Sequence, residues 1–158
     1  MSASPNSMSI LDLISSESMV VPLPATSKQE AMDLLMDHLG STAKLKDIDE
    51  IKHLVWTREN QRSTGIGNGL AIPHGKSDSI SQLMLVIGVL EDPIDFDSVD
   101  GKPVKMIALL LSPTKKIAEH IQALGKISRL MNDGAFREKA YGCGDPDELF
   151  QLIKCACE

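Results

Sequence analysis

The segment TGIGNGLAIPHGK, residues 64–76, decides most of what this chain of 158 residues can be. It carries three glycines at alternate positions, Gly65, Gly67 and Gly69. Glycine tolerates positive φ and lets the bare backbone approach a ligand closely. The apolar run 70–72 that comes next is typical of the end of a buried strand. Pro73 then fixes φ and holds the preceding residue extended, so His74 stands on a stiffened backbone.

This arrangement suits His74 to act as a nucleophile. Imidazole has a pKa of about 6.5, so it is mostly unprotonated and nucleophilic near neutral pH. Gly75 comes directly after it, and the amides of a glycine-rich turn can form an anion-binding nest for a phosphoryl group. A lone histidine is more often structural than functional, but this one is preceded by a proline and lies outside any helical stripe. We therefore interpret His74 as the reactive residue.

Two nucleotide-binding motifs resemble parts of this segment, but their spacing is wrong. The G-x-G-x-G pattern of residues 65–69 differs from G-x-G-x-x-G and comes after a predicted helix instead of a strand, which argues against a dinucleotide fold. The Gly-Lys-Ser of residues 75–77 resembles the end of a P-loop, but Leu70 stands where that motif needs glycine. A nucleotide-binding module remains a distant alternative, and it predicts that the protein retains ATP.

The composition bounds the class of protein. Hydrophobic residues make up 42% of the chain and aromatic residues 3%, which suits one domain with an aliphatic core. The net charge of −6 argues against a nucleic-acid partner, which would call for a basic patch. No apolar run reaches the ~20 residues of a membrane span, and no secretion signal opens the chain, so we expect a cytoplasmic protein without a membrane partner. The three cysteines are expected to be reduced thiols: Cys143, Cys155 and Cys157. No group of histidines and cysteines has the spacing of metal ligands.

The apolar pattern predicts one α/β domain. Continuous apolar runs at 83–90 and 104–111 are typical of strands covered on both faces, and a shorter strand at 19–21 is expected to end at Pro22. Helices between buried strands, without a repeat or a long linker, favour a single α/β unit. The predicted helices cover 10–14, 27–40, 47–60, 114–131 and 135–141, and a last one starts near Asp145.

Two of these helices carry specific signals. Ser27 with Glu30 forms a capping box, and Gly40 is a natural stop. The helix over 114–131 has one predicted core stripe, made of Ile117, His120, Ile121, Leu124, Ser128 and Met131. On the residues alone, His120 is interpreted as a partly buried histidine that covers the core.

The run Thr-Arg-Glu-Asn at 57–60, continued by 64–76, resembles the phosphohistidine signature of a known family. This is the mannitol/fructose-type enzyme IIA of the bacterial phosphoenolpyruvate:sugar phosphotransferase system. Within that family the chain is most similar to the free-standing nitrogen-regulatory enzyme IIA. The resemblance extends from about Ser9 to about Leu152, and it includes 28–35, 99–104 and the surroundings of His120.

The resemblance implies a fold and a domain boundary. It implies a mixed, mostly parallel sheet flanked by helices on both faces, in one domain over residues 9–158. Residues 1–8 are small and polar apart from the methionines, and we expect a disordered N-terminal tail there.

The resemblance also implies the residues of the site. His74 is the phosphorylated nucleophile, and His120 matches a second histidine that donates a hydrogen bond to the phosphoryl oxygens. Arg58 is either a cation at a helix C-terminus or, as the family implies, the guanidinium that meets the phosphoryl group during transfer. Further phosphate-binding candidates are Thr64, Gly75 and Glu59.

The resemblance implies a phosphohistidine carrier that needs no cofactor and no metal. It would accept a phosphoryl group on His74 from an HPr-like phosphocarrier protein and act as the nitrogen-regulatory IIA in signalling, through regulatory target proteins. The alternative is a stand-alone fructose- or mannitol-specific IIA that passes the phosphoryl group to a IIB acceptor. A third possibility is a binding regulator whose phosphorylation only changes which protein it docks to.

Overall fold

A computed structural model describes residues 8–157. Within this range the chain folds around one sheet of six strands, with the order β1-β5-β6-β3-β2 and β4 paired to β6. The strands are β1 (Met19–Leu23), β2 (Gly65–Gly67), β3 (Leu70–Ala71), β4 (His74–Ser77), β5 (Met84–Ile94) and β6 (Val104–Pro113). Three of the five pairings in this described part are parallel, and β2–β3 and β5–β6 are antiparallel. The predicted mixed, mostly parallel sheet is confirmed.

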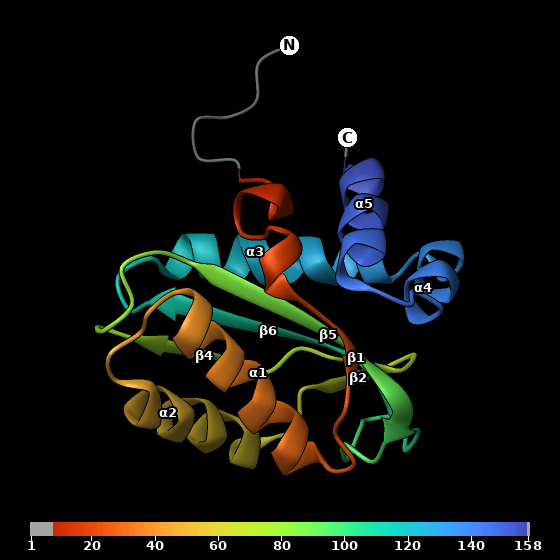
Figure 1. Cartoon of the computed structure of the whole chain (residues 1–158). Coiled ribbons are helices and arrows are strands. Elements are labelled where there is room, and N and C mark those ends of the chain that lie inside the picture. Colours follow the sequence, from red (N-terminus) through yellow and green to blue (C-terminus); the bar gives the residue numbers. More distant parts are fainter. Residues whose placement is uncertain (1–7, 158) are drawn as a thin grey trace.

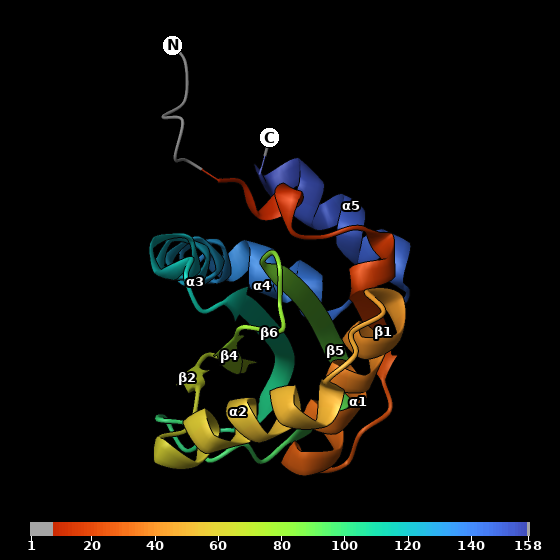
Figure 2. The ribbon, with the colours of Figure 1, turned by 90° about the vertical axis from the view of Figure 1, so that its left-hand side faces the viewer.

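Helices cover both faces of the sheet. Figure 1 and Figure 2 show α1 and α2 on one face and α3, α4 and α5 on the other. The helices are α1 (Lys28–Thr42), α2 (Ile48–Gln61), α3 (Ile117–Met131), α4 (Gly134–Tyr141) and α5 (Pro146–Cys157), preceded by the 3-10 turns η1 (Ile10–Asp12) and η2 (Ser16–Ser18). None of the helices in the described range has the length and apolar character that crossing a bilayer requires.

The two central strands separate two hydrophobic cores. In β5, Leu85 and Ile87 pack in the core under α3, α4 and α5, whereas Val86 packs in the core under α1 and α2. Side chains alternate between the faces of a strand, so a strand covered on both sides must be apolar throughout. This explains the continuous apolar runs of β5 and β6.

Several predicted element ends are wrong. The helix expected over 10–14 is the shorter 3-10 turn η1, and the helix expected from residue 114 begins at Ile117. Two further ends differ for a local reason. The strand β1 continues through Pro22 to Leu23, which is possible because β1 lies at an edge of the sheet and pairs only with β5 within the described residues. The helix α1 continues past Gly40 to Thr42. A Cβ atom on Gly40 would lie 3.3 Å from Cδ1 of Ile48, so this glycine allows α2 to approach α1 closely.

The predicted core stripe of α3 is also wrong in part. The side chains buried by this helix are His120, Ala123, Ile127 and Met131. Ile117 and Ile121 are instead 52% and 63% exposed. Apolar residues occupy two adjacent faces of α3, and periodicity alone does not say which of the two meets the sheet.

The expected tail over residues 1–8 lies outside the described residues except for Met8. Met8 is partly buried and packs against the core under α5. The boundary of the domain therefore stays a prediction.

Candidate active site

His74 is the first residue of β4, a short strand that the sequence did not predict. The strand pairs in parallel with β6, with His74 opposite Leu110, and the amide of Leu110 donates to the carbonyl of Pro73 at 3.0 Å. Residues 74–77 are mostly polar, so no apolar pattern indicates a strand. They form one because their backbone groups pair with those of β6. Gly75, which comes directly after His74, therefore lies within a strand.

The imidazole of His74 is oriented by its own backbone. Nδ1 lies 2.8 Å from the carbonyl oxygen of Ile72. A carbonyl can only accept a hydrogen bond, so Nδ1 carries the hydrogen and Nε2 keeps its lone pair. The ring is half-buried and lines a surface pocket, and Arg58 and Thr64 line the same pocket.

The glycines around His74 serve two different purposes. Gly67 and Gly69 have φ of 105° and 79°, and together with Asn68 at 58° they form the left-handed turn between β2 and β3. Gly75 allows close packing, because a Cβ atom there would lie 2.9 Å from Cγ2 of Val55 on α2. This contact brings α2, which carries Arg58, against the strand that carries His74.

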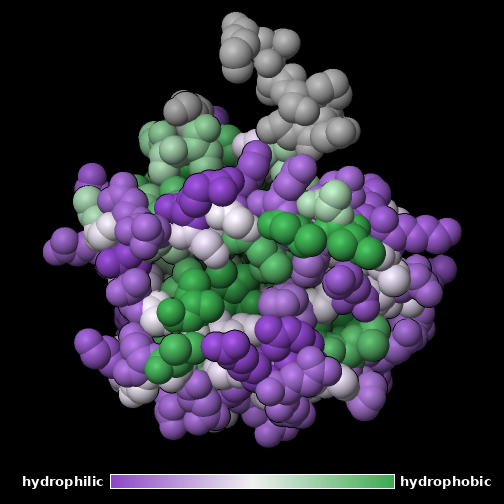
Figure 3. Space-filling view, turned by 180° about the vertical axis from the view of Figure 1, so that it is seen from behind, coloured by the Kyte–Doolittle hydropathy of each residue, from purple (hydrophilic) through white to green (hydrophobic). Residues whose placement is uncertain are grey.

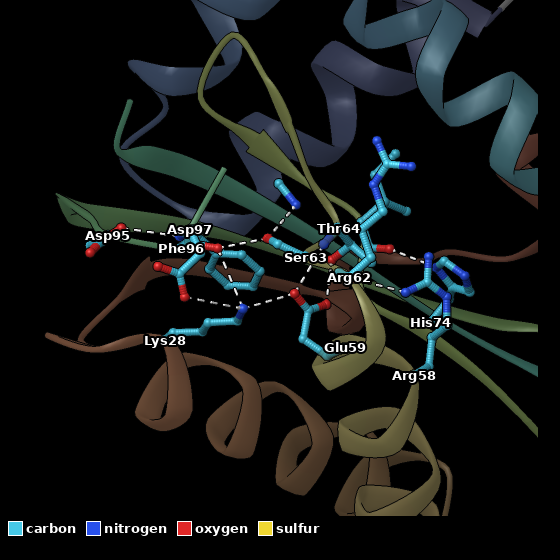
Figure 4. Close-up of polar contacts among 12 residues, drawn as sticks. Lys28, Arg58, Glu59, Arg62, Ser63, Thr64, His74, Asp95, Phe96 and Asp97 are labelled. Atoms are coloured by element: carbon cyan, nitrogen blue, oxygen red, sulfur yellow. Dashed lines mark hydrogen bonds and ion pairs between the residues drawn. The ribbon is translucent and has the colours of Figure 1, made fainter. Parts of the chain in front are cut away.

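Arg58 lies in the last turn of α2, as the sequence predicts. Its Nη1 donates to the carbonyl oxygen of Arg62 at 2.9 Å, which holds the guanidinium beside the pocket. Figure 4 shows Arg58 and His74 on the same side of the polar network that ends α2.

His120 reaches the same place from α3. It is only 3% exposed, and its ring centroid lies 5.3 Å from that of His74 with an interplanar angle of 61°. Its Nδ1 lies 2.7 Å from Oγ of Ser112 on β6. The structure thus brings together two histidines that lie far apart in the sequence.

Both imidazoles are kept neutral. Burial lowers the pKa of His120 from 6.5 to about 4, and the nearby charges of His74 and Lys76 act in the same direction. Burial also lowers the pKa of His74 below 6.5; Arg58 and Lys76 add to this, whereas the Ile72 carbonyl and Glu59 oppose it. A neutral His74 retains the lone pair that a nucleophile needs.

A buried polar network fixes the segment between Arg58 and the turn (Figure 4). The Glu59 carboxylate accepts from the Thr64 hydroxyl at 2.6 Å and from the Thr64 amide at 3.0 Å. Nζ of Lys28 lies 2.9 Å from the same carboxylate, and it also stands 4.7 Å above the ring centre of Phe96. The Ser63 hydroxyl donates to the Phe96 carbonyl at 2.7 Å, which closes the network. The phosphate contacts expected of Thr64, Glu59 and Gly75 stay predictions; in this geometry the Thr64 hydroxyl is already donating to Glu59.

Exposed apolar side chains border the pocket. Figure 2 places α3, β4 and β2 on one side of the molecule, and Figure 3 views that side and shows hydrophobic surface among hydrophilic residues. Four large exposed apolar side chains come from β2, from the segment before β6 and from α3. We call them the apolar rim: Ile66, Val99, Ile117 and Ile121. Ile66 and Val99 line the pocket of His74 directly.

Comparison with known proteins establishes the family. The family model described as phosphoenolpyruvate-dependent sugar phosphotransferase system, EIIA 2, matches residues 12–155. The chain belongs to this family. As an EIIA domain it is a component of a phosphotransferase system, and the family predicted from the sequence is confirmed.

Relatives of this EIIA domain include regulatory and sugar-specific proteins. It is 32% identical over 148 residues to a nitrogen regulatory protein of Bradyrhizobium diazoefficiens, covering 92% of this chain and 95% of that one. It is 33% identical over 129 residues to a fructose-specific EIIA component of Haloferax volcanii, covering 82% and 80%. Its structure matches that of the nitrogen regulatory protein IIA-Ntr from Neisseria meningitidis with a TM-score of 0.84 and 26% identity, over 91% of this chain and 98% of that one.

Three features of the EIIA site were not predicted. Ser112 contacts His120 from a strand end, and Lys28 reaches Glu59 from α1. Neither pair has a sequence spacing that signals contact, because each joins different elements. The exposure of Ile117 and Ile121 in the apolar rim is the third, because the periodicity of α3 predicts both in its core stripe.

Proposed function

We propose that this EIIA domain is a phosphohistidine carrier that accepts a phosphoryl group from an HPr-like phosphocarrier protein on Nε2 of His74. We further propose that it acts as a nitrogen-regulatory IIA, in signalling through target proteins. The single observation that carries the proposal is the hydrogen bond from Nδ1 of His74 to the Ile72 carbonyl, which leaves Nε2 bare beside Arg58. The half-buried, neutral ring supports nucleophilic attack near neutral pH.

The transfer step balances without moving a proton. The Nε2 lone pair of His74 attacks the phosphorus of the donor's phosphohistidine, and a new N–P bond forms as the old one breaks. The electron pair of the old bond returns to the donor's ring nitrogen. The hydrogen stays on Nδ1 of His74 throughout and remains hydrogen-bonded to the Ile72 carbonyl. The carbonyl therefore stabilises the positive charge that the phosphorylated ring carries.

Neighbouring residues supply positioning and charge. We assign Arg58 to the equatorial oxygens of the moving phosphoryl group, where a planar guanidinium suits spread negative charge. His120 donates a hydrogen bond to the same oxygens. Glu59 and Thr64 are proposed to act mainly by fixing the segment after Arg58, since they already bond each other. Gly75 is proposed to contribute through the close packing of α2 and β4 and to contact the phosphate through its backbone amide.

The apolar rim is proposed as the docking surface for the phosphocarrier. Ile117 and Ile121 lie on the exposed face of α3, and Ile66 and Val99 border the pocket that holds His74. Apolar surface that surrounds a reactive group is typical of a protein–protein contact. The exposed Arg62 and Lys76 add positive charge around this surface, although the whole chain has a net charge of −6.

The sugar-specific alternative has its own support, since the fructose-specific EIIA of Haloferax volcanii is as similar in sequence as the nitrogen regulatory relative. The two functions differ in the fate of the phosphoryl group on His74. Sustained phosphoryl flow to a IIB acceptor indicates transport, whereas a change only in affinity for target proteins indicates regulation.

The test is phosphorylation in a reconstituted system. The protein is incubated with phosphoenolpyruvate, enzyme I and an HPr-like carrier, and the adduct is mapped by mass spectrometry. We expect one acid-labile phosphoryl group on His74, which is absent in His74→Ala and unchanged in the control His53→Ala, an exposed histidine of α2. An adduct that persists in His74→Ala would contradict the proposed site.

A further inference from the structure

Ser112 lies at the end of β6, beside the second histidine of the site. Its side chain is 0% exposed, and Oγ is 2.7 Å from Nδ1 of His120. Either atom can be the donor in this contact, because the hydrogen can sit on the hydroxyl or on the ring nitrogen. In both cases Nε2 is the other ring nitrogen of His120, and the choice fixes whether Nε2 carries a hydrogen or a lone pair.

The surroundings of Ser112 decide between the two arrangements. Within residues 8–157, Nδ1 of His120 is the only side-chain hydrogen-bond partner recorded for the Ser112 hydroxyl. If Nδ1 carried the hydrogen, the buried hydroxyl hydrogen would have no acceptor. A buried donor without a partner is costly, so the arrangement in which Ser112 donates is favoured by roughly tenfold or more.

The other ring nitrogen of His120 is available to a ligand. In the described part of the chain the buried side-chain polar atoms without a partner are Ser98 Oγ and Gln122 Oε1, and Nε2 of His120 is not among them. No hydrogen bond to Nε2 is formed within residues 8–157 either, so this atom reaches accessible surface. It does so on a ring whose centre is 5.3 Å from that of His74.

We infer that Ser112 is a positioning residue that holds His120 in the Nε2–H tautomer, so that His120 presents a neutral hydrogen-bond donor to the phosphoryl group on His74. The role in transfer rests on the proposed function, whereas the tautomer is a property of the unphosphorylated protein. The two histidines are thus held in opposite tautomers. The Ile72 carbonyl keeps the hydrogen of His74 away from Nε2, and the Ser112 hydroxyl places one on Nε2 of His120.

The opposite tautomers make the two histidines complementary to a transferred phosphoryl group. One histidine offers a lone pair to phosphorus and the other offers a hydrogen to oxygen. Burial lowers the pKa of His120 to about 4 in the unphosphorylated protein, so its ring is neutral there at physiological pH and the tautomer decides which nitrogen carries the hydrogen.

The first test reads the tautomer directly. Long-range proton–nitrogen NMR correlations on the unphosphorylated protein at neutral pH distinguish a protonated from a bare ring nitrogen. We expect His120 to show a bare Nδ1 and a protonated Nε2 in the wild type and in Ser112→Thr, which keeps the hydroxyl. Ser112→Ala should shift both signals toward an average of the two tautomers. The control Ser77→Ala, a buried serine on the neighbouring β4 that bonds the amide of Ser79, should leave the pattern of His120 unchanged.

The second test separates positioning from general damage to the fold. Ser112→Ala is expected to slow phosphoryl transfer to His74 by roughly tenfold, in the range for partners that orient a functional histidine. In a His120→Ala background the same substitution should cause no further slowing, because its effect passes through His120.

Two results would overturn the inference. One is a wild-type spectrum with a protonated Nδ1 on His120. The other is an equal slowing by Ser112→Ala with and without His120, which would mark Ser112 as purely structural. Failure of His74 to become phosphorylated would refute the proposed function and leave the tautomer result standing, so the two failures are distinguishable.

Discussion

If His74 is the nucleophile, as proposed, the rate of phosphoryl transfer depends on the fraction of its imidazole that is unprotonated. Burial, Arg58 and Lys76 all disfavour the imidazolium, so the pKa of His74 lies below the ordinary 6.5. The consequence is that the nucleophile remains fully available through the neutral range. The same residue that is proposed to bind the phosphoryl group, Arg58, therefore also helps to keep the nucleophile ready.

The pH profile of phosphorylation tests this reasoning. We expect the rate of transfer from a pre-phosphorylated carrier to be constant above about pH 7 and to fall at lower pH, with a midpoint below 6.5. Single-turnover rates, corrected for the carrier's own titration by use of a second acceptor, give the midpoint. Arg58→Gln should move it upward, since one cation near the ring is lost. A midpoint above 6.5 in the wild type would contradict the assigned environment.

Arg58 is expected to matter more for rate than for stability. Arg58→Ala should slow transfer by about 10²-fold, as loss of one donor to a transition state does elsewhere. Arg129→Ala is the matched control, because Arg129 is an exposed arginine in the last turn of α3 and does not line the pocket of His74. Rapid-quench measurements on both variants give the comparison. Equal rates in the two variants would return Arg58 to a structural role at the end of α2.

At the scale of elements, the polar network beside the site lies where α1, α2 and the turn before β2 meet. The Glu59 carboxylate has a side-chain exposure of only 1% and is compensated by Lys28 from α1 and by Thr64. A buried charge that loses its partner is far more costly than an exposed one. This network therefore couples the stability of the α1–α2 layer to the position of Arg58, the residue before Glu59.

Replacing Lys28 should reveal that coupling. Lys28→Met is expected to destabilise the fold by about 3 kcal/mol, because it leaves a buried carboxylate uncompensated. The control is Lys52→Met, which breaks a 2.7 Å ion pair with Asp37, whose side chain is 58% exposed. Exposed pairs contribute about 0–1 kcal/mol, so the control should be nearly neutral. Urea unfolding measures both, and similar losses in the two variants would show that the network is not specially important.

Across the whole molecule, the reactive face differs from the rest of the surface. The chain carries a net charge of −6, yet the face with His74 combines the apolar rim with exposed basic residues. Large apolar side chains exposed in a group favour contact with another protein. The fold thus places His74, the proposed nucleophile, on the face that carries the apolar rim, between α2 of one helical layer and α3 of the other (Figure 2).

Charges introduced on the rim should weaken docking without unfolding the protein. We expect Ile117→Asp combined with Ile121→Asp to raise the KM for the phosphorylated carrier by about tenfold or more, with kcat little changed. The control is Leu34→Asp, a 38% exposed leucine on α1, at the opposite side of the sheet. Steady-state transfer at increasing carrier concentration distinguishes the two. A normal KM in the rim variant would place the docking surface elsewhere.

The sequence by itself determined the long strands and most of the helices, and it singled out His74 as the candidate nucleophile. The continuous apolar runs of β5 and β6 predict strands covered on both faces, and Ser27 caps α1 by accepting from the amide of Glu30. The other half of the predicted capping box is wrong, because the Glu30 carboxylate accepts from the amide of Thr26 and not from that of Ser27. Pro73 and the glycines before it single out His74. These signals are local: each depends on residues a few positions apart, whose effect on the backbone is the same in any fold.

Only the tertiary structure decided how these parts face one another. Periodicity groups the residues of α3 that share a face but does not say which face meets the sheet, so Ile121 was assigned to the core and the contact of His120 with Ser112 was not foreseen. The pairing of β4 with β6 produces no recognisable pattern in the sequence, because it uses backbone groups that nearly every residue has. The partnership of Lys28 with Glu59 joins two helices at a distance that only packing sets. The sequence determines the chemistry of each side chain, whereas the fold determines which other side chains it contacts, because contacts depend on which surfaces pack together.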